Sequence, residues 1–122
     1  LSRKNTMPLL QITTNATSQT FDTTTFQRDL ATRAAELVGK KLDYVMTTLE
    51  FFDHMTFAGT DAPAAYVEFK NIGTLDADLT KALSEVICDA LHETLEVSPE
   101  RVYIEFQEQA RHHWGWNRQN FA

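Results

Sequence analysis

Residues 95–107 read LEVSPERVYIEFQ, and they join the end of a helical pattern to a long strand. Within this stretch, residues 102–107 alternate between apolar and polar side chains, which is the period of a strand with one buried face. The residues Ser98-Pro99-Glu100-Arg101 predict a turn before it. Upstream, apolar residues recur at the spacing of one helix face: Leu79, Leu83, Val86, Ile87, Ala90, Leu91 and Leu95. The stretch therefore predicts a helix followed by a half-buried strand.

A further strand is predicted before this helix, because Ala65, Val67 and Phe69 alternate with polar or aromatic neighbours. The second half of the chain is thus a strand, a helix and a strand.

The first half repeats this order. Residues 7–14 favour a strand, residues 24–38 carry apolar side chains at helical spacing, and residues 44–52 favour a second strand. Gly39 directly after the helical pattern is typical of a left-handed helix cap. The segment LVGKK before the second strand matches LEVSP before the last one, which indicates a weak duplication of one βαβ unit.

Right-handed crossovers place the helices of two such units on one face of the sheet. We therefore predict an α/β (α+β) fold in which two βαβ units form a four-stranded mixed sheet with two helices on one face. Tyr103 and Glu105 then share the uncovered face. Because a second subunit would cover that face, the chain is expected to be an oligomer.

Length and composition limit the function classes. A chain of 122 residues with 43% hydrophobic residues supports one domain. Eleven Lys and Arg against 17 Asp and Glu, a formal charge of −6, argue against a nucleic-acid partner. The lone Cys88 excludes an internal disulfide and a cysteine-built zinc site. The sequence contains neither a signal peptide pattern nor an apolar run of membrane-spanning length, so no membrane association is expected.

No metal or cofactor is expected from the motifs. His112 and His113 are adjacent and would point to opposite sides of an extended segment, and His54 and His92 do not have ligand spacing. Glycine-rich nucleotide-binding loops and the serine-hydrolase elbow are also missing from the sequence.

The C-terminal tail is rich in aromatic residues, among them Trp114, Trp116 and Phe121. Taken alone, this composition favours packing against an edge or a subunit contact over a ligand pocket.

Five short motifs in register resemble the macrophage migration inhibitory factor and phenylpyruvate tautomerase family. They are Met7-Pro8, Gly39-Lys40, Asn71-Ile72-Gly73, the run SPERVYI from residue 98, and Gly115-Trp116-Asn117 followed by Phe121-Ala122. The resemblance covers the chain from Pro8 onward. It implies a symmetric homotrimer with active sites between subunits and a small α-keto acid, such as phenylpyruvate, as substrate.

The resemblance also implies roles for individual residues. Pro8 corresponds to the N-terminal proline that acts as the base, Lys40 supplies a cation and Ile72 supplies a backbone amide. Without the resemblance, Lys40 would be interpreted as a solvated lysine beside a helix end, and Ile72 as a core residue.

The remaining substrate-binding residues by resemblance are aromatic or polar. Tyr103 corresponds to a tyrosine of the neighbouring subunit, and Trp114 and Phe121 fall on hydrophobic positions of the pocket or its surroundings. Glu105 departs from the asparagine of the best-known animal members, which predicts an altered preference for ring-hydroxylated substrates. The Cys-x-x-Cys of some members is replaced by residues 64–67, AAYV, so thiol exchange is not expected.

The start of the chain conflicts with this mechanism, because Pro8 follows seven residues and its nitrogen is a tertiary amide without basicity. We therefore expect residues 1–7 to be an extension from expression or start-site choice, with a genuinely extended, catalytically silent protein as the alternative. Residues 8–122 then form the tautomerase-like domain, and removal of Met7 would free Pro8.

Three functions remain open at this point. The first is a keto–enol tautomerase that is inactive while the extension is attached. The second is a cytokine-like signalling or binding protein of the same fold with an unknown receptor, and the third is a generic ligand-binding α/β module. A cytoplasmic location is expected, with secretion by a non-classical route as the alternative.

Overall fold

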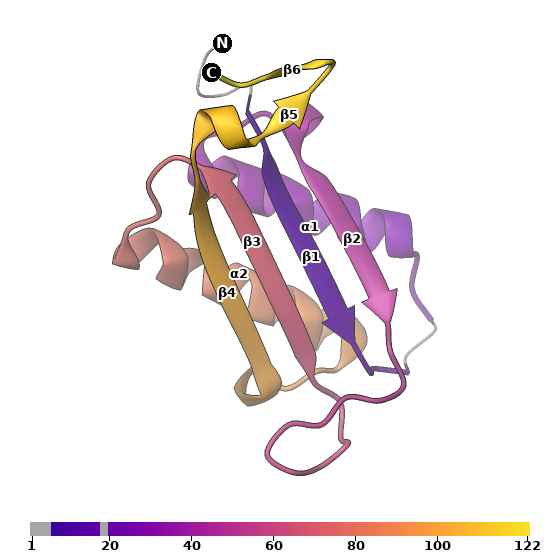
Figure 1. The fold of residues 1–122 in the computed structure, drawn as a ribbon. Coiled ribbons are helices and arrows are strands. Elements are labelled where there is room, and N and C mark those ends of the chain that lie inside the picture. Colours follow the sequence, from indigo (N-terminus) through magenta and orange to yellow (C-terminus); the bar gives the residue numbers. More distant parts are fainter. Residues whose placement is uncertain (1–5, 18–19) are drawn as a thin grey trace.

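The computed structural model describes residues 6–17 and 20–122, which form a sheet covered on one face by two helices (Figure 1). The main elements are β1 (Pro8–Thr14), α1 (Thr23–Val38), β2 (Met46–Phe51), β3 (Ala65–Ile72), α2 (Ala77–Leu95), β4 (Val102–Gln109), β5 (Gly115–Trp116) and β6 (Gln119–Asn120). Short 3-10 helices lie at Leu42–Tyr44, Pro99–Arg101 and Arg111–His113.

The large sheet has the strand order β2-β1-β3-β4. The pairs β1 with β2 and β3 with β4 are parallel, whereas the central pair of β1 and β3 is antiparallel. Each parallel pair is joined through one helix, so the sheet consists of two βαβ units placed head to tail. The predicted four-stranded mixed sheet with both helices on one face is confirmed.

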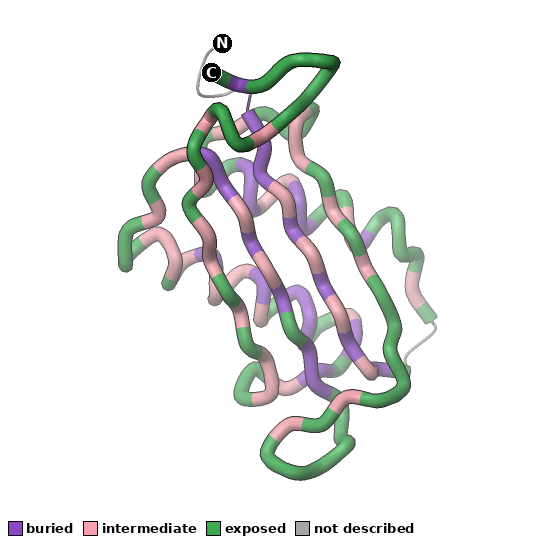
Figure 2. Tube along the Cα trace, in the orientation of Figure 1, coloured by how far each residue is buried: buried purple, intermediate pink, exposed green. Residues whose placement is uncertain are grey.

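The core lies between the sheet and the helices. Along β1 and β3, buried residues alternate with more accessible ones (Figure 2). Because successive strand side chains point to opposite faces, the buried ones share the face that packs against the helices. The central rows pair Leu10 with Phe69 and Ile12 with Val67 across the two strands. These rows are covered from the helices by Leu30, Leu83, Ile87 and Leu91. On the opposite face Tyr103 is 67% exposed, as predicted for the uncovered side.

Both helices are capped by an aspartate at the N-terminus and by a left-handed residue at the C-terminus. Asp22 and Asp76 each accept a hydrogen bond from a backbone N–H three residues later, at 3.2 and 2.9 Å. Gly39 ends α1 with φ 69°, and Glu96 ends α2 with φ 58°. A 3-10 helix comes after each cap, separated from it by a short gap, so the predicted similarity of the two segments extends to their backbone.

Several elements differ in detail from the sequence prediction. Leu42–Tyr44 forms a 3-10 turn, in which the Tyr44 and Val45 N–H groups donate to the Lys41 and Leu42 carbonyls, so β2 begins at Met46 instead of Tyr44. The first strand begins at Pro8, one residue later than predicted. The aromatic tail, for which no element was predicted, contains the hairpin of β5 and β6.

The end of the sheet away from Pro8 is closed by the loop of residues 53–64. The Arg101 guanidinium donates to four carbonyl oxygens of this loop, those of Phe57, Thr60, Ala62 and Pro63. The Phe57 ring in turn packs against Tyr103, with ring centroids 4.9 Å apart. The loop therefore fixes one side of the exposed Tyr103 ring.

The two helix caps generate a stability prediction. Replacing the exposed Glu96 by Gly removes the penalty of a side chain in the left-handed region, and should increase the free energy of unfolding by about 1 kcal/mol. The matched control is Glu93→Gly, an exposed position inside the same helix, which should lose about 1 kcal/mol. Urea unfolding at equal protein concentration measures both. A loss of stability in Glu96→Gly would contradict the assigned cap.

Candidate functional site

The start of β1 lies beside a cavity of about 370 Å³ at one end of the sheet. Pro8 is buried there as the first residue of the strand, and it pairs in register with Asn71 of β3. The cavity wall is mostly apolar and comes from three parts of the chain: Met7, Pro8 and Leu9; Asp43, Tyr44, Val45 and Met46; and Trp114, Gly115, Trp116 and Phe121.

The C-terminal tail forms the aromatic side of this cavity. The β5–β6 hairpin folds over the end of the sheet where β1 begins, so the C-terminal tail lies beside the start of β1 (Figure 1). Trp116 stacks on Phe121 with ring centroids 5.9 Å apart and an interplanar angle of 8°, and Tyr44 meets Trp116 edge-on at 5.4 Å. Phe121 is held by its backbone, because its N–H donates to the Trp114 carbonyl and its carbonyl accepts from Arg111 Nε.

Residues Thr6 and Met7 are buried at the same end of the sheet. The Met7 side chain packs with Ile72 and Phe121 in a small cluster separate from the main core. The Lys40 ammonium donates to the Thr6 hydroxyl and to the Ile72 carbonyl oxygen, the latter at 2.9 Å. Thr6 is 0% exposed, so the residues directly before Pro8 lie inside the site instead of at its rim.

A second cavity of about 260 Å³ lies beside Lys40 and Ile72. Its wall is formed by the C-terminal end of α1 and the turn after β3, with Val38, Gly39, Lys40, Asn71, Ile72, Gly73, Thr74 and Leu79. Gly39 adopts the left-handed conformation, which ends α1 and places Lys40 in the cavity wall. The backbone N–H of Lys40 donates to the Ala35 carbonyl oxygen. The helix cap therefore orients the residue that is the predicted cation.

Five of the seven predicted site residues thus gather at one end of the sheet: Pro8, Lys40, Ile72, Trp114 and Phe121. Ile72 takes part through its carbonyl oxygen and its side chain, which is 5% exposed. Its side chain therefore has the character of a core residue, and its contact to Lys40 belongs to the backbone.

Tyr103 and Glu105 lie elsewhere in the subunit. In the sheet register, Tyr103 is level with Tyr66 and Thr13, and Glu105 is level with Glu68 and Gln11. Among the described residues that line the two cavities, neither Tyr103 nor Glu105 occurs. One subunit alone does not bring them to Pro8.

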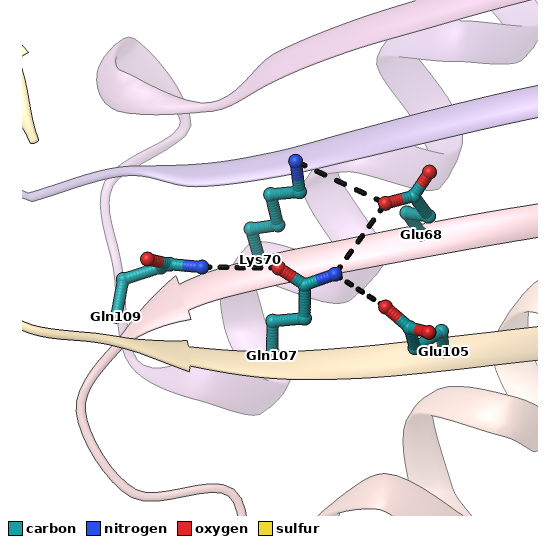
Figure 3. A network of polar contacts seen from close by, with 5 residues as sticks. All are labelled: Glu68, Lys70, Glu105, Gln107 and Gln109. Carbon is teal, nitrogen blue, oxygen red and sulfur yellow. Dashed lines mark hydrogen bonds and ion pairs between the residues drawn. The ribbon is translucent and has the colours of Figure 1, made fainter.

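Glu105 belongs to a polar network on the uncovered face (Figure 3). Gln107 Nε2 donates to the carboxylates of Glu105 and Glu68, and Gln107 Oε1 accepts from Gln109 at 3.1 Å. Lys70 forms an ion pair with Glu68 at 3.9 Å. Partial burial, together with the Glu68 and Glu105 carboxylates, raises the pKa of the neighbouring Tyr66. This face is therefore polar and negatively charged rather than a dry apolar surface.

The described residues offer little other chemistry. Within residues 6–17 and 20–122, no group of three or more His, Cys, Asp or Glu side chains could hold a metal ion. His112 and His113 lie in the 3-10 helix Arg111–His113 and not in an extended segment, and their ring centroids are 4.1 Å apart. The prediction that they point to opposite sides is therefore wrong. No helix in the described part of the chain is long and apolar enough to cross a membrane.

Sequence reasoning misses the 3-10 turn that lines the cavity. Asp43, Tyr44 and Met46 all line it, although the sequence pattern predicts Tyr44 at the start of a strand. One sequence feature could have predicted this turn: only a few residues separate the Gly39 cap from β2. A connection that short must turn tightly, which places its residues beside the start of β1. Asn71 lies in one of the motifs of the resemblance, but the sequence predicts no role for it.

Comparison with known proteins agrees with this architecture. The family model for macrophage migration inhibitory factor matches residues 7–122. Mouse macrophage migration inhibitory factor is 31% identical over 97 residues, covering 80% of this chain and 84% of the mouse protein. The Xenopus tropicalis protein is 28% identical over 116 residues, covering 95% of this chain and 100% of the relative. The crystal structure of a Prochlorococcus marinus homologue superposes with a TM-score of 0.88 at 36% identity, covering 93% of this chain and 99% of that one.

The paired βαβ units with an aromatic site at the start of the first strand therefore define a protein of the tautomerase superfamily. Within that class, the chain belongs to the macrophage migration inhibitory factor family. The family fold suggests an oligomeric assembly.

The packing of the tail generates a second prediction. Phe121→Ala removes a side chain that is 2% exposed and stacked on Trp116, and should lower the free energy of unfolding by about 3 kcal/mol. Because both tryptophans lie in the tail, Trp114 and Trp116 fluorescence should also shift toward the red as the tail detaches. Phe52→Ala is the control, since Phe52 is 48% exposed, and should change stability by less than about 0.5 kcal/mol. Equal effects of the two substitutions would show that the tail is not docked.

Proposed function

We propose that the chain beginning at Pro8 is a keto–enol tautomerase of phenylpyruvate-like α-keto acids. The observation that carries the proposal is the convergence of Pro8, the Lys40 ammonium and an aromatic cavity at one end of the sheet. These are the groups that the reaction requires: a base, a cation for the carboxylate and an apolar space for the ring.

Pro8 acts as the general base in this proposal. A free secondary amine that is buried in an apolar wall near the Lys40 cation loses basicity, because desolvation and like charge both disfavour its protonated form. It is then unprotonated near neutral pH. Its lone pair takes a proton from C3 of the keto acid, the C3–H electrons form the C2–C3 double bond, and the carbonyl electrons move onto O2. Protonation of O2 from solvent gives the enol, Pro8 returns its proton to solvent, and ketonisation is the reverse.

Lys40 binds the substrate carboxylate. Its ammonium already lies against an oxygen ligand, the Thr6 hydroxyl, and is fixed from the other side by the Ile72 carbonyl. A carboxylate oxygen in place of that hydroxyl would form a charge-assisted hydrogen bond. The backbone amide of Ile72 is the proposed donor toward the developing enolate oxygen. The ring of the substrate then extends toward Trp114 and Phe121.

The residues before Pro8 prevent this reaction while they are attached. The Met7–Pro8 peptide bond removes the basic lone pair of the proline nitrogen. Thr6 and Met7 also occupy the site, because Thr6 contacts Lys40 and Met7 packs against Ile72 and Phe121. The proposal includes Met7 as the natural start, removed in the cell to free Pro8. Leu1 to Asn5 lie outside the described residues.

The proposed assembly is a homotrimer. The uncovered sheet face supports it, and Tyr103 and Glu105 would complete the site of a neighbouring subunit, which explains why they lie far from Pro8 in their own subunit. A cytoplasmic location belongs to the same proposal. The cytokine-like alternative shares the fold and differs in requiring neither Pro8 nor turnover.

The proposal predicts a difference between two forms of the chain. The form beginning at Pro8 should tautomerise phenylpyruvate, whereas the form beginning at Leu1 should have little or no activity, because its Pro8 nitrogen is acylated and its Lys40 is occupied by Thr6. Activity is measured as the absorbance change of the enol, with each N-terminus verified by mass spectrometry and each assembly by light scattering.

The control for this comparison is Pro8→Gly in the short form, which keeps a free amine but changes its basicity and its ring. It should reduce turnover without dissociating the trimer. Equal turnover by the long form, free of any processed fraction, would remove Pro8 as the base, and a monomer mass at micromolar concentration would contradict the trimer.

Lys40 provides an independent prediction. In the form beginning at Pro8, Lys40→Met should lower kcat/KM for phenylpyruvate about 10- to 100-fold, because a hydrogen bond to a charged group is lost. Lys41→Met is the matched control, since Lys41 is exposed and absent from both cavity walls, and should leave kcat/KM within about twofold. Steady-state kinetics measure kcat/KM for both variants. An unchanged kcat/KM in Lys40→Met would exclude Lys40 from the site.

A further inference from the structure

Asn71 is a polar residue in an apolar row. The residues of β3 that face the helices are Ala65, Val67, Phe69 and Asn71, and all four are buried. Asn71 is 3% exposed, but its side chain ends in an amide, whereas the other three side chains of the row are apolar. An amide at this depth requires hydrogen-bond partners.

One end of this amide is unsatisfied. Asn71 Oδ1 is buried and has no hydrogen-bond partner among the described residues. At the other end of the sheet, Asn15 shows how this fold treats a structural amide: its Nδ2 donates to loop carbonyls and its Oδ1 accepts from the Ala64 N–H at 2.7 Å. Gln11 Oε1 also lacks a partner, but it lies on the uncovered face, whereas Asn71 lies on the core face. A buried acceptor without a donor destabilises the folded state, so its retention calls for a function.

The position of Asn71 relates it to the proposed reaction. It is the directly opposite cross-strand neighbour of Pro8 and its side chain is on the same face, which sets the two Cβ atoms about 5 Å apart. It also lines the cavity that contains Lys40 and Ile72. An acceptor at this place is within reach of the C2 oxygen of a substrate whose carboxylate is bound to Lys40.

We propose that Asn71 is a substrate-contacting residue whose amide oxygen accepts a hydrogen bond from the C2 hydroxyl of the enol. The inference rests on the proposed function and adds a ligand preference to it. The C2 oxygen of the keto acid has no proton to donate, whereas the enol and other 2-hydroxy acids do. Asn71 Oδ1 therefore selects 2-hydroxy carboxylates with an apolar tail over the same acids without the hydroxyl.

The test uses two inhibitors that differ only in this hydroxyl: phenyllactate, tested as each enantiomer, and 3-phenylpropanoate. Their dissociation constants are measured by calorimetry with the chain beginning at Pro8. This form retains nearly the whole region matched by the family model, which begins at residue 7. One phenyllactate enantiomer should bind about three- to tenfold more tightly than 3-phenylpropanoate, the contribution of one neutral hydrogen bond.

Leucine is close to isosteric with asparagine. In Asn71→Leu, the ratio of the 3-phenylpropanoate dissociation constant to the phenyllactate dissociation constant should fall to about one, while 3-phenylpropanoate binds as before. Its melting temperature should stay constant or rise, because an unpaired buried oxygen is removed. Asn71→Ser is the second variant, since its hydroxyl supplies an acceptor and should restore part of the ratio. It also keeps the test informative if the leucine variant does not fold.

The outcomes separate the two proposals. If both inhibitors bind and their ratio is unchanged in Asn71→Leu, Asn71 does not contact the hydroxyl, and the tautomerase proposal is unaffected. The same conclusion holds if the leucine variant loses stability while keeping the ratio, because Asn71 would then be structural. If neither inhibitor binds and the Pro8 form has no tautomerase activity, the proposed function fails and this inference fails with it.

Discussion

The antiparallel pairing of β1 with β3 is the contact on which the rest of the structure depends. It joins two βαβ units that are each parallel within themselves, and its register places Leu10 opposite Phe69 and Ile12 opposite Val67 in the buried rows. A slip of one residue would move these side chains to the uncovered face. The same register places Pro8 opposite Asn71 at the last pair of the ladder. The packing of the core therefore also determines which residues lie beside the candidate base.

The head-to-tail arrangement explains why the subunit has two different ends. Each helix runs back along its first strand, so α1 ends beside the start of β1, and α2 ends beside the start of β3, at the opposite end of the sheet (Figure 1). Both helices end in a left-handed residue, but the residue after it differs between them. After Gly39 comes Lys40, which reaches the Ile72 carbonyl, and after Glu96 comes Val97, which is fully buried. The duplicated fold thus carries a cation at only one of these two equivalent positions.

Much of this arrangement could be predicted from the sequence because it depends on local periodicity. The alternation in residues 102–107 and the stripe from Leu79 to Leu95 specify which side chains face the core, and right-handed crossovers then place both helices on one face. The 3-10 turn at Leu42–Tyr44 and the β5–β6 hairpin could not be predicted in this way. Both are too short for a periodic signal, and their conformation depends on contacts such as Tyr44 with Trp116 between segments far apart in sequence. The proposed roles of Pro8 and Lys40 rest on family resemblance, since their spacing alone predicts no chemistry.

The residues of the candidate site are divided between the two ends of the sheet. Pro8, Lys40 and the aromatic tail lie at one end, while Tyr103, the Arg101-bound loop and Phe57 lie at the other. A rigid sheet cannot fold its far end onto its near end, so Tyr103 can meet a Pro8 only if that Pro8 belongs to another copy. In a closed ring of subunits, each copy would give its Pro8 end to one neighbour and its Tyr103 end to the other, as in a heterologous interface. The negative charge of Glu68 and Glu105 on the face between these ends makes a wet contact there more favourable than a dry one. Such an assembly would be needed for a complete site, because Tyr103 and Pro8 lie at opposite ends of one subunit.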